Sequence, residues 1–424
     1  MQRRLWRLCT AAALGICLAG SLNAQRAWTW QELRDRFEAD NPSLRAARLS
    51  VDEARAQEVT AYLRPNPELT FSNDGTQIAP TEGNWKPFAG TQFAPGISYL
   101  LERRHKRELR LESARDETVI TQAQFADQER NLLFNLRNSF VQALQAKAVL
   151  GVARESLDYY DRVLQVSNER YRAGDIARVD LDRLELQRVQ FESDVLTAET
   201  NVRTAKIQLL MLLDDRTPVD RFDIDGPFDF HENVAGLDEL RDQALTIRPD
   251  LRAAVHAVEK AKADNRLAYA NASADPTVGA WYTHNPSFNN PFAQNTLGVN
   301  VSIPLRIFDK NQGERARTQI EIRRSERLSE AARAQVFSDV DSAYATLNSN
   351  LALLRPYRSK YLTLAIQVRD NVSFSYQHGG SSLLDFLNAQ NQYRSVQLSY
   401  LNLVGAYLTS ANQLNLAVGR EVVQ

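Results

Sequence analysis

The chain has 424 residues and a formal net charge of −1, with 43% apolar and 24% charged side chains. This is the composition of an ordinary folded protein, and it lacks the strong positive charge that indicates nucleic-acid binding. Both cysteines, Cys9 and Cys17, lie within the first 24 residues. Without that segment the chain has no thiol, which excludes disulfides and thiolate metal sites.

Residues 1–24 have the pattern of a secretory signal peptide. Three arginines precede an apolar run from Leu8 to Ala19, and Leu22–Ala24 gives a cleavage site. Lipidation would use Cys17, but the bulky Ile16 stands where such signals need a small residue, so we do not expect it. No later stretch approaches ~18 apolar residues, so a chain that crosses a membrane would have to do so with β-strands.

The remainder begins with two short helical segments that end before Pro65 and Pro67. Residues 67–101 then contain two runs in which apolar and polar residues alternate, which predicts a pair of strands around a loop. Residues 106–172 contain no proline, which predicts a helix roughly 100 Å long. A second helical segment follows, so residues 106–213 are expected to form a long helical hairpin.

The second half of the chain repeats this order. Eight residues of the segment 33–47 recur 207 positions later, from Leu240 to Ala254. A second strand pair is expected at 276–305 and a second long hairpin at 311–418. We therefore predict two repeats, 25–221 and 237–424, joined by a linker at 222–236.

The turns of the two hairpins carry the same residues. Tyr171, Gly174 and Asp180 recur 205 positions later as Tyr376, Gly379 and Asp385. Glycine provides the backbone freedom that ends a helix, so each copy predicts the tip of a hairpin.

The long helices also carry an apolar seam, which runs from Val340 to Val372 in steps of three and four residues and is typical of coiled-coil packing. Gly151 and Pro356 lie 205 positions apart in the two long helices, and we expect a bend or local irregularity at both.

The number of strands constrains the assembly. The four predicted strands are compatible with a soluble sheet, but four strands cannot close a barrel, and open sheet edges are not tolerated in lipid. Two chains would give a barrel of eight strands, and side chains fill the interior of a barrel of that size. Three chains would give twelve strands and leave a lumen. A trimeric conduit is the simplest assembly that satisfies both the strand and the hairpin patterns.

The paired Tyr-x-x-Gly-x-x-x-x-x-Asp tips and the twice-repeated order of elements resemble the TolC family of outer-membrane efflux proteins. The stretch Arg64–Leu69 is similar to the CzcC-type, heavy-metal branch of that family. The resemblance implies a mainly α fold with a transmembrane β-barrel portion. It would be a homotrimer with a twelve-stranded barrel in the outer membrane of a Gram-negative bacterium and a long periplasmic α-helical barrel.

In members of this family the second tip carries the constriction, with carboxylates six and nine residues after the glycine. Asp385 occupies the first of these positions here, but Asn388 occupies the second. A simpler interpretation of Asp385 is an N-terminal cap or first-turn acid of the outgoing helix.

The tips would contact a periplasmic adaptor, or membrane fusion protein, that links the duct to an inner-membrane RND-type transporter. The candidate contact residues are Tyr171, Gly174, Asp180, Tyr376 and Gly379. The glycines have a structural role in the turn first of all, and the tyrosines are better explained by packing between neighbouring helices. Asp180 would also favour the start of its helix.

The sequence offers little for other chemistry. The five histidines, His378 at the second tip among them, lack metal-ligand spacing, and no phosphate loop, nucleophile elbow or catalytic cluster is present. We therefore expect no enzyme activity, no cofactor and no metal site. The basic run at residues 103–107 would lie either near anionic lipid headgroups or on a solvated helix face.

The leading hypothesis is an outer-membrane exit duct of a tripartite efflux system, which passively conducts substrates that include heavy-metal cations. One alternative is a non-channel periplasmic adaptor or coiled-coil scaffold. The other is the outer-membrane duct of type I protein secretion.

Overall fold

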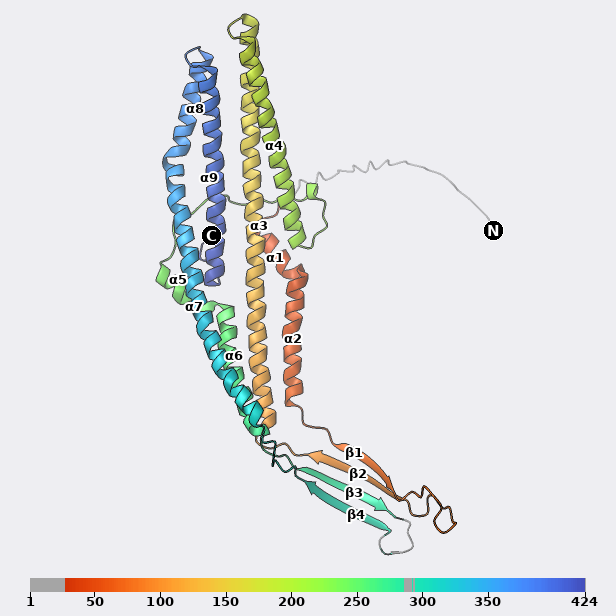
Figure 1. Ribbon diagram of the computed structural model, residues 1–424. Helices are drawn as coiled ribbons and strands as arrows, with labels where there is room; N and C mark the ends of the chain where they lie inside the picture. The colour runs from red at the N-terminus through yellow and green to blue at the C-terminus, as the bar shows by residue number, and fades with distance from the viewer. Residues whose placement is uncertain (1–26, 286–291, 293, 424) are drawn as a thin grey trace, which may run out of the picture.

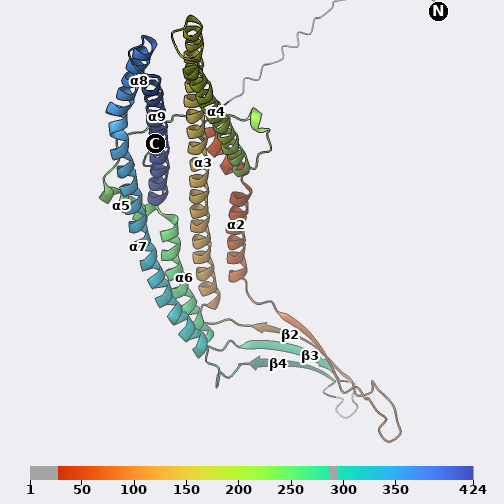
Figure 2. The ribbon, with the colours of Figure 1, turned by 45° about the horizontal axis from the view of Figure 1, so that its top comes forward.

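The structure is a computed structural model that describes residues 27–285, 292 and 294–423. The predicted signal peptide, with both cysteines, lies outside this range. The molecule is long and curved, with two helical hairpins at one end and a single sheet at the other (Figure 1, Figure 2). No helix of the described residues is both long enough and apolar enough to cross a membrane.

The two halves contain the same elements in the same order. The first half contains α1 (Trp30–Asp40), α2 (Pro42–Tyr62), β1 (Glu68–Asp74), β2 (Gln92–Leu100), α3 (Lys106–Ala173), α4 (Arg178–Leu212) and the short helix η1 (Val219–Arg221). The second half contains α5 (Leu237–Ile247), α6 (Pro249–Asn271), β3 (Thr277–His284), β4 (Asn295–Ser302), α7 (Gln312–Pro356), η3 (Tyr357–Tyr361), α8 (Leu362–Gln377) and α9 (Leu383–Val418).

Local signals explain where the first helices begin. Thr29 and Glu32 form a capping box at α1, in which each side chain accepts a hydrogen bond from the other residue's backbone N–H. Asn41 caps α2, and Pro42 occupies its first turn, where the missing N–H costs nothing.

The sheet is an antiparallel meander in the order β1-β2-β3-β4, so the outer edges of β1 and β4 are unpaired within the described chain. The register places the alternating apolar residues of all four strands on one face. Leu69 pairs with Ile97, Ile97 with Ala280, and Ala280 with Val299. The opposite face carries mainly Thr, Ser, Asn and Gly, so the sheet separates an apolar environment from a polar one.

Trp281 is a large aromatic side chain on the otherwise mainly polar face. It pairs with Gly96 on one side and Gly298 on the other. A Cβ atom on Gly298 would collide with the indole ring, so glycine is needed there for the ring to lie across the strand.

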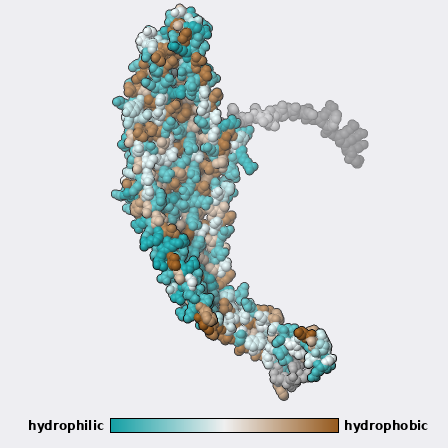
Figure 3. All heavy atoms as spheres, viewed as in Figure 1, coloured by the Kyte–Doolittle hydropathy of each residue, from teal (hydrophilic) through white to brown (hydrophobic). Residues whose placement is uncertain are grey.

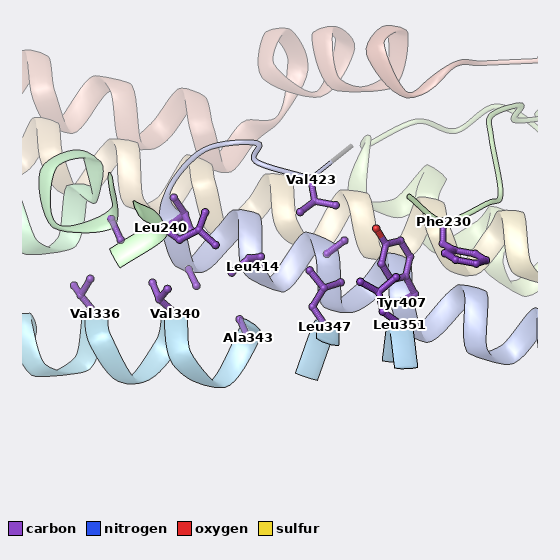
Figure 4. Close-up of a cluster of buried hydrophobic side chains, with 14 of the residues drawn as sticks. Phe230, Leu240, Val336, Val340, Ala343, Leu347, Leu351, Tyr407, Leu414 and Val423 are labelled. Carbon is purple, nitrogen blue, oxygen red and sulfur yellow. The ribbon is translucent and has the colours of Figure 1, made fainter. Parts of the chain in front are cut away.

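Three apolar clusters hold the helices together. The first includes Phe37, Leu136 and Leu209 of α1, α3 and α4, and it also takes in Phe222 and Ile224 of the connection between the halves. The second joins α5, α7 and α9 around Leu347 and Tyr407 (Figure 4). The predicted linker is therefore packed into the core and is not a free tether.

The third cluster lies near the tips and joins all four hairpin helices. Its buried members are Tyr160, Val163, Leu184, Phe191, Tyr376, Leu383 and Phe386. The two hairpins are therefore packed against each other as well as within themselves.

The predicted irregularities have different outcomes. At Pro356 the prediction is confirmed, because α7 passes there into a five-residue π-helix before α8 begins. At Gly151 it is wrong, because α3 is a continuous α-helix of 68 residues. A helical glycine costs only about 1 kcal/mol relative to alanine, which packing can offset, whereas proline removes a backbone donor and clashes with the preceding turn.

The π-helix changes which face of the seam is buried. Below it, Val340, Leu347 and Leu354 are fully buried, as expected from the apolar spacing. Above it, Leu364 and Val368 are exposed, and Ser373 and Tyr376 face the core. The wider turn of a π-helix shifts the phase of the helix, so the apolar stripe of α8 points away from its own chain.

Candidate functional site: the two hairpin tips

Both hairpins turn with the same backbone motif. Gly174 (φ 86°) and Gly379 (φ 77°) adopt left-handed conformations just after the incoming helix. In each case the next residue donates its backbone N–H to a carbonyl five residues back, from Asp175 to Arg170 and from Gly380 to Ser375, at 2.8 Å. This is the Schellman arrangement, and it explains why the glycine recurs in both copies.

The first tip is densely charged and internally neutralised. Residues 169–188 contain five arginines and five acids. Asp182 accepts a hydrogen bond from Arg178 at 2.8 Å, and Asp180 lies 3.9 Å from Arg183. Tyr171 is partly exposed beneath Arg178, whose guanidinium lies 5.7 Å from the ring centre.

The second tip contrasts with the first because it is almost free of charge. Between residues 371 and 393, Asp385 is the single acidic or basic residue apart from His378. In the described part of the chain Asp385 forms no ion pair. Asn388, one turn further along α9, is exposed as well.

Asp385 does form the capping interaction that the simpler interpretation predicts. Its Oδ2 accepts hydrogen bonds from the Ser382 hydroxyl at 2.6 Å and from the Ser382 backbone N–H at 3.2 Å. These bonds hold the pKa of Asp385 below its usual range. The carboxylate is therefore fixed in position, exposed and charged at neutral pH.

The two tip tyrosines differ in their surroundings. Tyr376 is buried and stacks on Phe386 with 5.0 Å between the ring centres. Arg170 of the first hairpin donates to the backbone carbonyl of Tyr376 at 3.2 Å, and its guanidinium lies 5.4 Å from the ring centre. Tyr376 is thus a packing residue that joins the hairpins, whereas Tyr171 is accessible from outside.

Two further polar contacts join the hairpins below the tips. The hydroxyls of Tyr159 and Ser373 are 2.6 Å apart, and Arg394 of α9 lies 2.6 Å from Asp194 of α4. Sequence patterns did not reveal these residues, because the partners are some 200 positions apart and follow no local spacing.

His378 has a local role at the second tip. Its ring lies 4.1 Å from that of Phe374, and its Nδ1 is 2.8 Å from the Phe374 carbonyl oxygen. Among the described residues, no group of three or more His, Cys, Asp or Glu side chains is placed to hold a metal ion.

Known proteins share this architecture. A family model described as outer membrane efflux protein matches residues 33–214 and 240–420. The chain is 24% identical over 390 residues to the cobalt-zinc-cadmium resistance protein CzcC of Cupriavidus metallidurans, covering 90% of this chain and 87% of that protein. It is 25% identical over 408 residues to the pyoverdine export outer membrane protein OpmQ of Pseudomonas aeruginosa, covering 91% and 84%. The structure of CusC superposes with a TM-score of 0.77 at 21% identity, covering 92% of each chain.

Two hairpins and a four-stranded antiparallel sheet, each half built on the same plan, define the TolC-like fold. The chain belongs to the outer membrane efflux protein family, in two tandem copies of the family unit. It is an outer-membrane channel protein that extends into the periplasm, in a family that is not enzymatic. The resemblance inferred from the sequence is confirmed, and the non-channel alternative is rejected.

Replacing Gly174 with alanine tests the turn motif. A Cβ atom would meet no other atom within 4 Å there, so the cost comes from the left-handed backbone alone. We expect Gly174→Ala to destabilise the protein by about 1–2 kcal/mol, measured by chemical unfolding followed by circular dichroism. Gly151→Ala is the matched control, because this glycine is helical and unobstructed. That change should stabilise α3 by about 0.5–1 kcal/mol, and equal effects at the two sites would contradict the assignment.

Replacing Asp194 with asparagine tests the contact between the hairpins. Both side chains of the Arg394–Asp194 pair are about one quarter exposed. We expect Asp194→Asn to cost about 1 kcal/mol and to speed amide hydrogen exchange in the upper halves of α4 and α9. Glu199→Gln is the control, since Glu199 pairs with Arg154 within the first hairpin and both partners are more exposed. Faster amide exchange in Glu199→Gln but not in Asp194→Asn would argue against a stabilising contact between the hairpins at Arg394 and Asp194.

Proposed function

We propose that three copies of this chain form the outer-membrane exit duct of a tripartite efflux system. The main support for this proposal is that the sheet edges and the outer helices of the single chain expose groups that need a partner. The sheet ends at β1 on one side and at β4 on the other. Open edges of this kind are costly in lipid, and three four-stranded sheets joined edge to edge would leave none.

The helical flank formed by α4 presents an apolar stripe that none of the described residues covers. Its exposed members are Val179, Leu186, Val189 and Leu196, spaced by seven, three and seven residues. This is the spacing of a coiled-coil seam that lacks its second helix. Brown patches follow the helices over much of the visible face, between teal ones (Figure 3).

The opposite flank, formed by α7 and α8, carries a second stripe. Leu353, Tyr361, Leu364 and Val368 are exposed there. Leu364 and Val368 follow the π-helix, whose shift of phase turns this part of the stripe outward, so α8 of one chain has the surface needed to pack against α4 of the next.

In the proposed trimer the sheets form one closed barrel of twelve strands. The apolar face, with Phe71, Ile97 and Val299, would contact lipid, and the polar face would line the water-filled duct. Each repeat, 25–221 or 237–424, would supply one strand pair and one hairpin, connected through residues 222–236.

Within this duct, Asp385 forms the periplasmic constriction together with Asn388. Three copies would place three fixed, exposed carboxylates around one axis, which attracts cations and excludes anions. The contrast between the tips supports this assignment, since Asp385 forms no ion pair with any residue that the structure describes, whereas Asp180 lies 3.9 Å from Arg183. With Asn388 in the second position, the ring carries one charge per chain.

The exposed ends of the hairpins would receive a periplasmic adaptor, which couples the duct to an inner-membrane RND-type transporter. Tyr171, Gly174 and Asp180 at the first tip and Gly379 at the second form this surface, whereas Tyr376 contributes by holding the two tips together. Heavy-metal cations are the proposed cargo, in keeping with the name of CzcC and with the acidic constriction.

The assembly and conductance are tested together. Purified protein should have the mass of a trimer in detergent and form steady, cation-preferring pores in planar bilayers. A monomer without conductance would refute the proposal. Loss of cobalt, zinc or cadmium tolerance on deletion of the gene, restored by the intact chain, would support the proposed cargo. Unchanged tolerance would refute the cargo and leave the duct itself intact.

Leu186→Glu tests the helical interface. The side chain is exposed in the single chain and enclosed in the trimer, so a charge there should weaken assembly by about 3 kcal/mol or more. Analytical ultracentrifugation would measure the shift toward monomer. Ile78→Glu places the same charge at an exposed apolar residue in the loop between β1 and β2, and it should leave the trimer intact.

Asp385→Ala tests the constriction. Removing three like charges should weaken block by multivalent cations roughly tenfold in single-channel recordings, while Asp180→Ala should change it little. In the unmodified protein block should be present at neutral pH and be lost only below the ordinary titration range of an aspartate, because the pKa of Asp385 is lowered and protonation neutralises the ring. Equal block in both variants would remove Asp385 from the constriction.

A further inference from the structure

A pocket of about 330 Å³ lies where the sheet meets the helices of the first half. It is formed by the end of α2, the end of β2 and the start of α3. Its lining includes Arg64, Tyr99, Leu101, Arg103, Arg104 and Arg107. The basic run noted in the sequence thus lines one cavity at the start of α3, where Arg103, Arg104 and His105 are exposed.

Most of the cations at this junction have structural partners. Lys106 is buried and lies 2.6 Å from Asp275, while Arg103 donates to the carbonyl of Ala274 at the end of α6. Arg107 stacks over the Tyr62 ring at 4.2 Å and pairs with Glu108. The contacts of Lys106 and Arg103 tie the first half of the chain to the second, and Arg107 neutralises Glu108, one of the two acids that line the pocket.

Glu102, the other acid of the pocket, is neutralised in the same way, by a paired contact with Arg110. Two guanidinium groups of the lining remain: in the described part of the chain, neither Arg64 nor Arg104 makes a hydrogen bond or an ion pair. Arg104 is exposed and has a φ of 61°, a conformation that costs free energy for a non-glycine residue. The pocket therefore has a net positive charge that no acidic group of the described residues neutralises.

The pocket opens at the end of the apolar face of the sheet. Tyr99, which lines it, pairs with Val278 and shares that face with Ile97. Leu101, also in the lining, and Leu63, just after α2, are exposed beside it. A molecule bound there would meet two cations at one end and a continuous apolar surface at the other, which is the chemistry of a phospholipid.

We propose that this pocket binds the phosphate group of a phospholipid from the periplasmic leaflet of the outer membrane, with Arg64 and Arg104 as its ligands. The acyl chains lie along Leu101, Tyr99 and Ile97. The inference rests on the proposed function in one respect, namely that the apolar face of the sheet contacts lipid. Guanidinium groups suit this role because they present paired donors to phosphate oxygens and remain charged at the membrane surface.

The second half of the chain provides a matched control. Lys310 precedes α7 as Arg104 precedes α3, and both are exposed basic residues beside a residue with positive φ. Lys310 is not part of the pocket. A general attraction of basic residues to the membrane would involve Arg104 and Lys310 equally, whereas a specific site at the pocket involves Arg104 but not Lys310.

The experiment measures phosphatidylglycerol bound to the detergent-solubilised trimer by native mass spectrometry. The double variant Arg64→Gln/Arg104→Gln should bind this lipid about tenfold more weakly or worse, and Lys310→Gln should bind it as the unmodified protein does. Planar-bilayer conductance, measured on the same samples, should be the same for the double variant, the Lys310→Gln control and the unmodified protein. Loss of conductance in the unmodified protein would instead indicate failure of the proposed duct.

Two results would overturn the proposal. One is a failure of the variants to differ as expected: the double variant binds the lipid as well as the unmodified protein does, or Lys310→Gln loses as much lipid binding as the double variant. The other is displacement of the lipid by millimolar inorganic phosphate, which would indicate a site for soluble anions. Lack of displacement by phosphate, together with loss in the double variant, supports a phospholipid site that needs both the phosphate and the acyl chains.

Discussion

The unpaired edges of the sheet are the constraint on which the rest of this structure depends. Backbone N–H and C=O groups along the outer edges of β1 and β4 need partners wherever water is excluded, and no described strand of the chain supplies them. The same incompleteness recurs along α4 and α8, where apolar stripes face outward. The sheet edges and the helical stripes both need a neighbouring chain, so one assembly would pair the strands and cover the helices.

Duplication gives the two halves a common framework, and local departures from it give each half its own role. Both tips use the same glycine turn, but one is rich in balanced charge and the other carries Asp385 almost alone. Gly151 and Pro356 lie at equivalent positions of the two long helices, 205 residues apart, but only Pro356 changes the helix. The resulting shift of phase turns the stripe of α8 toward the exterior.

Charge is used in two ways along the molecule. At the junction of sheet and helices, Lys106 and Asp275 form a buried pair that fixes how the strands leave the helices. At the second tip, the Ser382 hydrogen bonds fix the Asp385 carboxylate while leaving it exposed. Capping and ion attraction are therefore compatible functions of one side chain, because the cap uses one carboxylate oxygen and leaves the other free.

The sequence by itself determined the duplicated order of elements, the strand pairs and the positions of both tips, because these follow from periodicity, proline and glycine, which act locally. It did not determine that α3 continues through Gly151, since the small cost of an exposed helical glycine is offset by the packing of the rest of the long helix. Nor did it distinguish the buried Tyr376 from the exposed Tyr171, although both occupy the same place in the motif. The contacts of Arg170 and Arg394 with the other hairpin join residues some 200 positions apart, so only the tertiary structure, which brings the hairpins together, decided them.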